Sequence, residues 1–466
     1  MKKNIITILM VSLAVGLHAQ QKISLSDCRA MALEQSEQVK IADKQVEKAE
    51  TEKAAMRTNY LPSISGSVTG VYLNKTIEQD LYLPTVIPDM TTGELTPNVM
   101  VNPSTGEPVI GADGNPVFNM YAWMPLEISL QGAYMAGLTL EQPLYTGGKI
   151  MTGNKMAALG VEMAKSNKQL QQANSLYEAD QTYWLYVSVN EKVRLAKSYV
   201  KLLDALVKTV NDAYETGMVT KNDVLKVKVK QNEAQLQLQK ANSGLELTRM
   251  ALCRVTGLDF NTQIEATDTI IEIDQPDVKI EENNLSNRPE YELLKNQVEM
   301  ANHQIKLAKA DFLPTAGVRV GYSYIGGIEL NNSQFSSNDL NVMASVNIPI
   351  FHWGEGIKKT QSAQRDKDIK QLEMDKNSRL MELEIEQARL NFADAKVRVN
   401  LANETLIQAE ANLKESNDNY EVGMEILTNL LEAQLQWQNA YSETIDAKTD
   451  YKLKESALLK ATGALK

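Results

Sequence analysis

Few side chains in this 466-residue sequence have the types and spacing that catalysis requires. Outside the N-terminal segment the histidines are His303 and His352, and each is expected on a helix surface or at a strand end rather than in a triad or metal site. The segment TGGKI at residues 146–150 ends like a phosphate-binding loop, but it lacks the upstream glycine and the following Ser or Thr. Carboxylate pairs are frequent because the predicted helices are charged. We therefore expect no enzyme, metal or cofactor.

Cys28 and Cys253 are the cysteines of the chain. In an oxidising periplasm they can form one disulfide. Two unpaired cysteines buried on helices agree equally well with the sequence, because chain spacing does not show whether the Cα atoms lie within bonding range. Both interpretations stay open at this point.

The first 19 residues resemble a secretory signal peptide. Lys2 and Lys3 precede the apolar run IITILMVSLAVG, and Ala19 is a suitable cleavage residue. The run is short for a membrane span, although an N-terminal anchor is the alternative. No lipid-attachment cysteine follows the signal, and no later run reaches the roughly 18 apolar residues that a membrane helix needs. If the mature chain crosses a membrane, we expect it to use strands.

The net charge of −11 argues against a nucleic-acid partner, because the phosphates would repel the chain. The sequence has few aromatic residues and many Ala, Gln, Asn, Glu and Lys, which favours long helices over a thick globular core.

Two copies of one unit make up the chain, and this repeat predicts the architecture. YETGMVTKNDVL begins at Tyr214 and YEVGMEILTNLL at Tyr420, an offset of 206 residues (420 − 214). The prolines of NYLPS and DFLPT are offset by 252 residues (314 − 62), so the first copy holds about 46 extra residues (252 − 206). Other pairs at the shorter offset are Pro143 with Pro349 and Thr256-Gly257 with Thr462-Gly463.

The repeat also predicts the domain boundaries. After the signal peptide at 1–19, the first repeat spans 20–258, a linker spans 259–284, and the second repeat spans 285–466. Each repeat is expected to contain a helix, a strand pair and a long helical hairpin. The extra residues of the first repeat fall in a stretch rich in proline and glycine, which we expect to form a long loop at 84–125.

Long helices are predicted wherever proline is absent. A first helix is expected from Ser24 to Asn59, and a leg from Gly148 to Tyr214 would reach about 100 Å. The return legs carry seams spaced by three and four, which an ordinary two-stranded coil also shows. Leu225, Leu431 and Leu435 lie beside the seams, which indicates neighbours on more than one side. The seams are Val224, Val227, Gln231, Ala234, Leu238, Ala241, Leu245, Thr248, Leu252 and Leu430, Ala433, Trp437, Ala440, Thr444, Ala447, Tyr451, Lys454, Leu458.

Between the proline pairs the apolar period changes to two. TAGVRVGYSY, NVMASVNI, SISGSVTGVY and the run from 127 to 140 each alternate apolar residues with polar or small ones. A lipid-facing barrel strand and a soluble sandwich strand both give this pattern, and the signal peptide favours the barrel. Four strands cannot close a barrel, whereas a dimer supplies eight and a trimer twelve. The predicted fold is mainly α with β, and the choice between dimer and trimer stays open at this point. If the strands close as a trimeric twelve-stranded β-barrel, the helical hairpins would continue it as a periplasmic α-barrel.

This arrangement of motifs resembles the TolC-like outer membrane efflux proteins. LPS and LPT enter the strand pairs, PLY-GG and PIF-WG leave them, Y-x-x-G-M marks the helical turns, and TG closes each copy. The resemblance covers essentially the whole mature chain. It implies a homotrimeric channel surrounded by outer membrane lipid in a Gram-negative bacterium, docked to a periplasmic adaptor (membrane fusion) protein and an inner membrane transporter.

The resemblance also implies roles for the two Tyr-x-x-Gly turns, which are the periplasmic tips of the hairpins in the family. The adaptor-docking tips would be Gly217, Met218, Val219, Gly423 and Met424, and the entrance constriction would be Asp223, Tyr420, Glu425, Asn429 and Glu432.

The entrance departs from the best-known pattern, in which an arginine and two aspartates form an ionic lock and an acidic ring. This chain has Glu425, Asn429 and Glu432 at those positions, and Lys221 is the residue that can replace the arginine. Threefold repetition of the two glutamates would give six carboxylates near the axis. Without the resemblance, Asp223 and Glu432 would be interpreted as solvated helix surface.

The predicted function is a passive exit duct for small toxic compounds in a tripartite efflux system. An alternative with the same fold is the exit duct of a type I protein secretion system. An alternative of another class is a soluble periplasmic coiled-coil scaffold with a strand domain.

Overall fold

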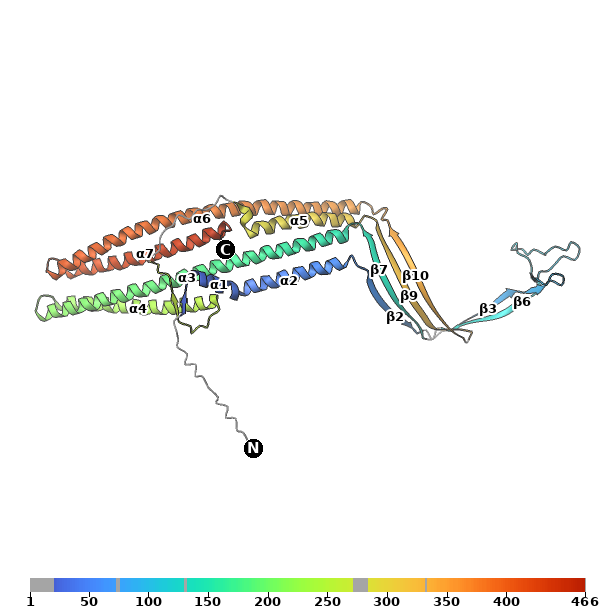
Figure 1. The fold of residues 1–466 in the computed structure, drawn as a ribbon, viewed down its shortest axis with the longest axis horizontal. Coiled ribbons are helices and arrows are strands. Elements are labelled where there is room, and N and C mark those ends of the chain that lie inside the picture. The colour runs from blue at the N-terminus through green and yellow to red at the C-terminus, as the bar shows by residue number, and fades with distance from the viewer. Residues whose placement is uncertain (1–20, 73–75, 130–131, 271–283, 332, 466) are drawn as a thin grey trace, which may run out of the picture. The chain divides into compact units, whose positions relative to one another are not determined.

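The computed structural model describes residues 21–72, 76–129, 132–270, 284–331 and 333–465 (Figure 1). The chain divides into a helical unit, which comprises Met1–Ala54, Asn154–Ile305 and Thr360–Lys466, and a strand unit, which comprises Ala55–Gly153 and Lys306–Lys359. The predicted combination of mainly helices with some strands is confirmed. The signal peptide expected at 1–19 and residues 271–283 of the expected linker lie outside the described residues.

Two long helical hairpins dominate the helical unit, as Figure 1 shows. Corresponding helices of the two repeats match in length: α3 and α6 each have 67 residues, and α2 and α5 each have 22. The helices are α1 (Leu25–Gln35), α2 (Glu37–Thr58), α3 (Lys149–Glu215), α4 (Lys221–Thr256), α5 (Pro289–Ala310), α6 (Glu355–Glu421) and α7 (Leu427–Ala461), with a 3-10 turn η1 (Leu285–Asn287) before α5.

Local capping decides where several helices begin and end. At the start of α1, Asp27 N–H donates to Ser24 Oγ at 3.2 Å and Ser24 N–H donates to Asp27 Oδ2 at 3.1 Å, which is a capping box. The single helix predicted from Ser24 to Asn59 is divided at Ser36, where the backbone leaves the helical region. Gly257 ends α4 in the left-handed conformation, with a φ of 74°.

In the part of the chain that the structure describes, the apolar core residues form three clusters along the helices. The first cluster packs α1, α3, α4 and α7 around Tyr183 and Leu252. The second joins α3, α4 and α7 near the tips, and the third joins α6 to α7 around Tyr451. All nine predicted seam positions of α7 are buried or half-buried. Ala433, Ala440 and Ala447 are among them, and such small residues allow neighbouring helices to approach closely.

A buried carboxylate joins three helices in the first cluster. Asp180 on α3 is fully buried and accepts hydrogen bonds from Arg29 Nε at 2.6 Å and Arg29 Nη2 at 2.7 Å. The Ser456 hydroxyl donates to it at 2.7 Å. Because Arg29 lies on α1 and Ser456 on α7, this one side chain connects the two repeats.

Both cysteines are free thiols buried in the helical unit, so the disulfide alternative is wrong. Cys28 Sγ faces the carbonyl oxygen of Ala179 at 3.9 Å, and Cys253 Sγ lies 3.9 Å from Arg249 Nη1. Burial raises the pKa of Cys28 to about 12 and also raises the pKa of Cys253. Both side chains therefore remain protonated and unreactive at neutral pH.

The main sheet of the strand unit has the antiparallel order β2, β7, β9, β10. Its register places Ile64, Leu140, Val320 and Val342 in one row across the sheet, on one face. The next row, on the opposite face, is Ser65, Thr139, Gly321 and Asn341. The strands are β2 (Ser63–Val71), β7 (Ala133–Thr146), β9 (Thr315–Leu330) and β10 (Ser333–Asn347). One face is thus apolar and the other polar or small, as the alternation predicts.

A second hairpin continues this sheet. β3 (Thr76–Pro84) pairs with β6 (Tyr121–Ser129), and β6 joins β9 beside Leu330. The single strand predicted across 127–140 is therefore wrong, because β6 ends at Ser129 and β7 begins at Ala133. Val71 pairs with Ala133 and Thr76 with Ser129, so the register between the two strand pairs shifts by one residue.

The stretch 84–125, expected as a long loop, is ordered by backbone pairing over much of its length. β4 (Val86–Pro88) pairs with β5 (Leu95–Pro97). Isolated bridges then join Val99 to Phe118, Val101 to Pro108 and Ile110 to Pro116. In the helical unit, β1 (Gln21–Ile23) pairs in parallel with β8 (Ile264–Ala266), which lies in the expected linker. Among the described residues, no helix has both the length and the apolar character needed to cross a membrane.

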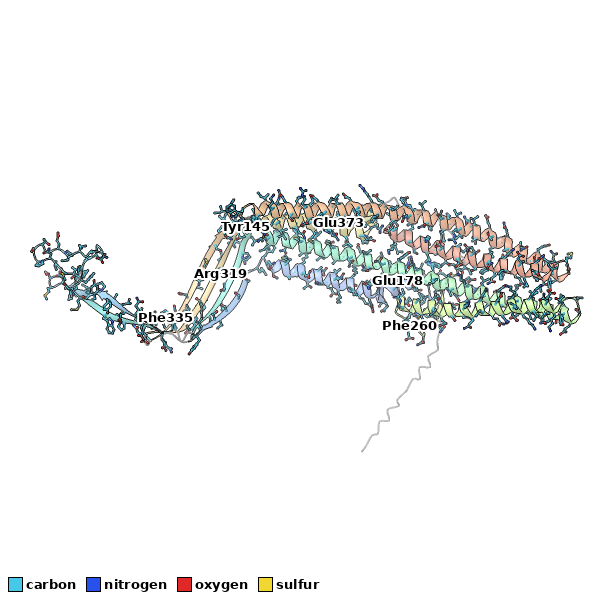
Figure 2. All side chains as sticks on the ribbon, turned by 180° about the vertical axis from the view of Figure 1, so that it is seen from behind. Tyr145, Glu178, Phe260, Arg319, Phe335 and Glu373 are labelled. Atoms are coloured by element: carbon cyan, nitrogen blue, oxygen red, sulfur yellow. The ribbon has the colours of Figure 1, made fainter. Side chains whose placement is uncertain are left out.

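Replacing Asp180 with alanine is expected to lower the free energy of unfolding by about 3–5 kcal/mol, because the substitution leaves the Arg29 guanidinium largely buried without its carboxylate. The measurement is the shift in urea-induced loss of helical circular dichroism. Glu178 is the matched control: it lies two residues away on α3 (Figure 2), and its ion pair with Arg254 is more than half exposed. Glu178→Ala should cost about 1 kcal/mol or less. Equal losses for both variants would contradict the role of Asp180.

Candidate functional site

The two hairpin tips have the same backbone geometry. Gly217 and Gly423 both have a φ of 76°. At the first tip, Met218 N–H donates to the carbonyl of Ala213 at 2.8 Å; at the second, Met424 N–H donates to Asn419 at 2.9 Å. Each glycine N–H also donates to a carbonyl three residues earlier, Gly217 to Tyr214 at 3.0 Å and Gly423 to Tyr420 at 3.1 Å. Together these bonds form a Schellman motif, which ends a helix with a left-handed residue. The repeated Y-x-x-G-M signal therefore encodes one turn made twice.

The return helices begin differently. At the start of α4, the Thr220 hydroxyl and the Asp223 carboxylate form a capping box, with Oγ1 and Oδ2 2.7 Å apart. The hydrogen bonds from Thr220 lower the pKa of Asp223. Helix α7 begins after Ile426, which makes no side-chain capping bond. Asp223, the carboxylate predicted at the entrance on the first hairpin, therefore also caps the N-terminus of α4.

The predicted docking residues occupy the exposed ends of the hairpins. Met218 is 81% exposed and Met424 76%, so both thioethers are available for contact with another protein. Val219 instead packs against the apolar cluster below the first tip.

Of the predicted entrance residues, the structure brings Tyr420 and Asp223 together. Tyr420, near the end of α6, packs against the second apolar cluster. Burial raises the pKa of Tyr420, and the negative charge of Asp223 raises it further. The lysine that pairs with Asp223 is Lys226, at 3.4 Å, rather than Lys221.

The other three entrance residues lie on the second hairpin and do not form one cluster. Within the described residues, Glu425 has one carboxylate oxygen buried without a hydrogen-bond partner. Asn429 is exposed. Glu432 is exposed and accepts a hydrogen bond from Gln436 at 3.3 Å.

Glu432 also borders a cavity of about 570 Å³ between α4 and α7. Leu225 and Val229 on α4 are 53% and 55% exposed, and Leu435 on α7 is 43% exposed, so the cavity has an apolar floor. Charged side chains surround this floor: Lys226, Lys230 and Glu233 from α4 and Glu432 from α7. We call this cavity the tip groove.

The sequence pointed to part of the tip groove. Leu225, Leu431 and Leu435 stand beside the seams, and all three line the groove. Val229 and the two lysines were missed, although Val229 follows Leu225 by four residues and so lies on the same helical face. The pair Leu225 and Val229, two apolar residues spaced i, i+4 outside the seam, could have indicated this apolar face from the sequence.

The sequence is similar to known proteins of the bacterial outer membrane efflux family and to a secretion protein. The family model described as outer membrane efflux protein matches residues 282–464. The alkaline protease secretion protein AprF of Pseudomonas aeruginosa is 21% identical over 334 residues, which cover 68% of this chain and 67% of AprF.

Comparison of the fold gives the same class over nearly the whole chain. The CmeC outer membrane channel of Campylobacter jejuni superposes with a TM-score of 0.70 at 18% identity, covering 95% of this chain and 86% of CmeC. The open state of the MtrE outer membrane channel of Neisseria gonorrhoeae gives 0.71 at 15% identity, covering 95% and 89%.

The fold is thus that of outer membrane channels, which are not enzymes. The resemblance to the TolC-like outer membrane efflux proteins that the motifs predict is thus confirmed, by the family model over residues 282–464 and by the similarity to AprF and CmeC. Its location is the outer membrane of a Gram-negative bacterium, with a large periplasmic helical part. The alternative of a soluble periplasmic scaffold is therefore wrong.

Gly217→Val and Gly423→Val are each expected to impair transport while assembly remains intact. A Cβ at either position meets no atom within 4 Å, so the cost is confined to the backbone of the turn, about 1–2 kcal/mol. The measurements are transport in complemented deletion cells and the mass of the extracted protein. Asn tolerates the left-handed conformation, so Gly217→Asn and Gly423→Asn are the controls and should retain transport. Loss of assembly in the valine variants would contradict the tip assignment.

Proposed function

We propose that this protein is a homotrimeric exit duct through which an inner membrane pump, acting through a periplasmic adaptor, expels small toxic compounds. The observation that carries the proposal is the four-stranded sheet with two open edges. Within the described residues β2 pairs with β7 and β10 with β9, so the outer edges of β2 and β10 remain available.

These edges fit each other in a closed assembly. β2 runs antiparallel to β10 by way of the two strands between them, so pairing β10 of one copy with β2 of the next keeps every neighbour antiparallel. Three copies supply twelve strands, enough for a wide barrel. The apolar face then meets lipid and the polar face lines the lumen.

The hairpin tips support the adaptor contact. Exposed Met218 and Met424 stand at the two turns, and the tip groove offers apolar floor residues with both signs of charge at its rim. Methionine adapts to irregular surfaces, and charged rims add specificity to apolar contacts. Asp223, Tyr420, Glu425, Asn429 and Glu432 would constrict the entrance formed by the same tips in three copies.

Protein secretion is the second candidate. It is favoured by one observation, the similarity to AprF, which is named for the secretion of an alkaline protease. The same trimeric duct would then carry an unfolded polypeptide supplied by a different inner membrane transporter.

The detergent-extracted protein is expected to have the mass of a trimer. The full chain has a mass of 51.8 kDa, so the trimer should have slightly less than three times this mass once the expected signal peptide is removed. Light scattering corrected for bound detergent measures this mass. A barrel wide enough for a water-filled pore requires more strands than the four or eight that one or two copies provide. A monomer or dimer that persists across detergents and concentrations would therefore overturn the trimeric duct.

Deletion of the gene separates the two candidate functions. We expect greater sensitivity to small toxic compounds with an unchanged set of secreted proteins, and restoration by the wild-type gene. Growth inhibition assays and mass spectrometry of the medium supply the two measurements. Unchanged sensitivity combined with loss of a secreted protein would contradict efflux and support secretion.

A further inference from the structure

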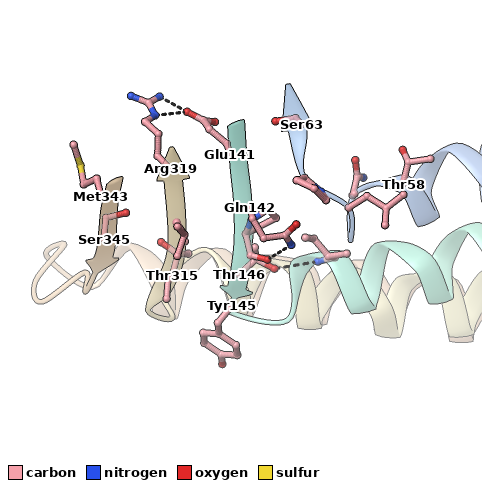
Figure 3. A pocket seen from close by; sticks show the side chains of 18 residues that line it. Thr58, Ser63, Glu141, Gln142, Tyr145, Thr146, Thr315, Arg319, Met343 and Ser345 are labelled. Carbon is pink, nitrogen blue, oxygen red and sulfur yellow. Dashed lines mark hydrogen bonds and ion pairs between the residues drawn. The ribbon is translucent and has the colours of Figure 1, made fainter. Parts of the chain in front are cut away.

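An ion pair lies on the polar face of the sheet, where the neighbouring side chains in the same row are uncharged. Glu141 on β7 and Arg319 on β9 are directly opposite each other in the register. Arg319 Nε donates to Glu141 Oε1 at 2.7 Å, and Arg319 Nη2 donates to the same oxygen (Figure 3). Both side chains are about half exposed, 56% for Arg319 and 48% for Glu141.

The two neighbours of this pair carry no charge. The register continues the row outward to Ser63 on β2 and Met343 on β10, so the row reads Ser63, Glu141, Arg319, Met343 across all four strands. All four residues line a cavity of about 900 Å³ at the end of the sheet where β9 begins (Figure 3).

The following rows of the polar face are made of Ser, Thr, Gly and Asn until Asp339 on β10, opposite Ser323. That carboxylate is four residues from the Arg319 level along β9, about 13 Å away. Glu141 and Arg319 are therefore separated from the next charge on this face by more than a Debye length at ~0.15 M salt, about 8 Å.

Stability does not account for the pair. A half-exposed cross-strand ion pair contributes at most about 1 kcal/mol, and a pair of hydroxyl side chains like those in the next rows would suit the sheet equally well. The pairing matters more for the electrostatic potential of the lumen than for stability. A single unpaired charge on this face would be repeated three times around a trimeric lumen.

We propose that Arg319 neutralises Glu141 to form a ring of three paired charges, which makes this level of the channel wall indifferent to the charge of the cargo. The proposal rests on the proposed function, in which the polar face lines a water-filled duct. Without Arg319, three carboxylates would hold cationic compounds and repel anionic ones. Without Glu141, three guanidinium groups would bind acidic compounds or peptides. The paired ring lets both classes pass.

The test measures the local potential directly in the full chain reconstituted in liposomes. Ser63→Cys places a thiol beside Glu141, and Met343→Cys places one beside Arg319, each about 5 Å away across the strands. The rates of modification by a cationic and by an anionic methanethiosulfonate reagent of similar size are compared. Native Cys28 and Cys253 are fully buried, so the parent protein is the unlabelled background.

At low salt, Arg319→Gln should raise the ratio of the cationic rate to the anionic rate at both reporters by about threefold or more, and Glu141→Gln should lower it by a similar factor. The double variant removes both charges and should restore the wild-type ratio. Arg319→Lys, which keeps the charge, should also retain it. At ~1 M salt, where the Debye length is about 3 Å, the differences should largely disappear.

A reporter at Thr69→Cys serves as the matched control. Thr69 lies on the same face of β2, six residues from Ser63 and therefore about 20 Å away. At low salt its rate ratio should change much less than the ratios at the two near reporters, and at ~0.15 M salt, where the Debye length is about 8 Å, it should not respond to either charge variant. Unchanged ratios at Ser63→Cys and Met343→Cys in all backgrounds, with both reagents reacting, would overturn the proposal and leave the duct intact. Failure of either reagent to reach any of the three reporters in the assembled protein would instead overturn the water-filled duct, and the proposal with it.

Discussion

The constraint on which the rest of the structure depends is that backbone hydrogen-bonding groups in lipid must be paired. Within the described residues one chain supplies four strands of the main sheet, with the outer edges of β2 and β10 unpaired. Four strands are too few to form a closed barrel. In the proposed trimer the antiparallel order lets each open edge pair with the next copy. The sheet can then present Ile64, Leu140, Val320 and Val342 to lipid while hydroxyl and glycine residues face water. In the proposed trimer, the alternation of side chains and the need for several copies would both follow from this pairing requirement.

The helices answer a different requirement, because helices of 67 residues cannot be buried in a compact core. Among the described residues their apolar contacts are spread over three clusters; the first two connect helices that are far apart in the sequence, and the third connects the consecutive helices α6 and α7. Small seam residues such as Ala433 and Ala447 let neighbouring helices approach closely. Because alanine fits against many partners, other contacts have to determine which helices pack together. Asp180 makes such a contact, because it accepts hydrogen bonds from Arg29 of the first repeat and Ser456 of the second. This buried carboxylate has its hydrogen-bond donors only when α1, α3 and α7 pack together.

The sequence predicted those features that depend on local pattern. The offset of 206 residues anticipated the bounds of α3 and α6, and the Y-x-x-G-M signal anticipated both left-handed turns. Contacts between distant segments were not predictable. Alternation over 127–140 could not reveal the one-residue shift between β6 and β7, because a register is set by the partner strand. For the same reason the pairing of Glu141 with Arg319, 178 residues apart, was missed, and only the folded structure decided between a disulfide and two buried thiols.

Corresponding helices of the two repeats match in length, but the repeats differ at the tips, and the difference falls on the predicted entrance residues. Thr220 and Asp223 cap α4, an interaction that contributes about 1 kcal/mol to a helix start. At the second tip, α7 begins after Ile426, whose side chain makes no capping bond, and within the described residues Glu425 buries one carboxylate oxygen without a hydrogen-bond donor. An unsatisfied buried acceptor lowers the stability of the conformation that holds it. The start of α7 is therefore less firmly fixed than that of α4, and Glu425, Asn429 and Glu432 all lie on this less constrained segment.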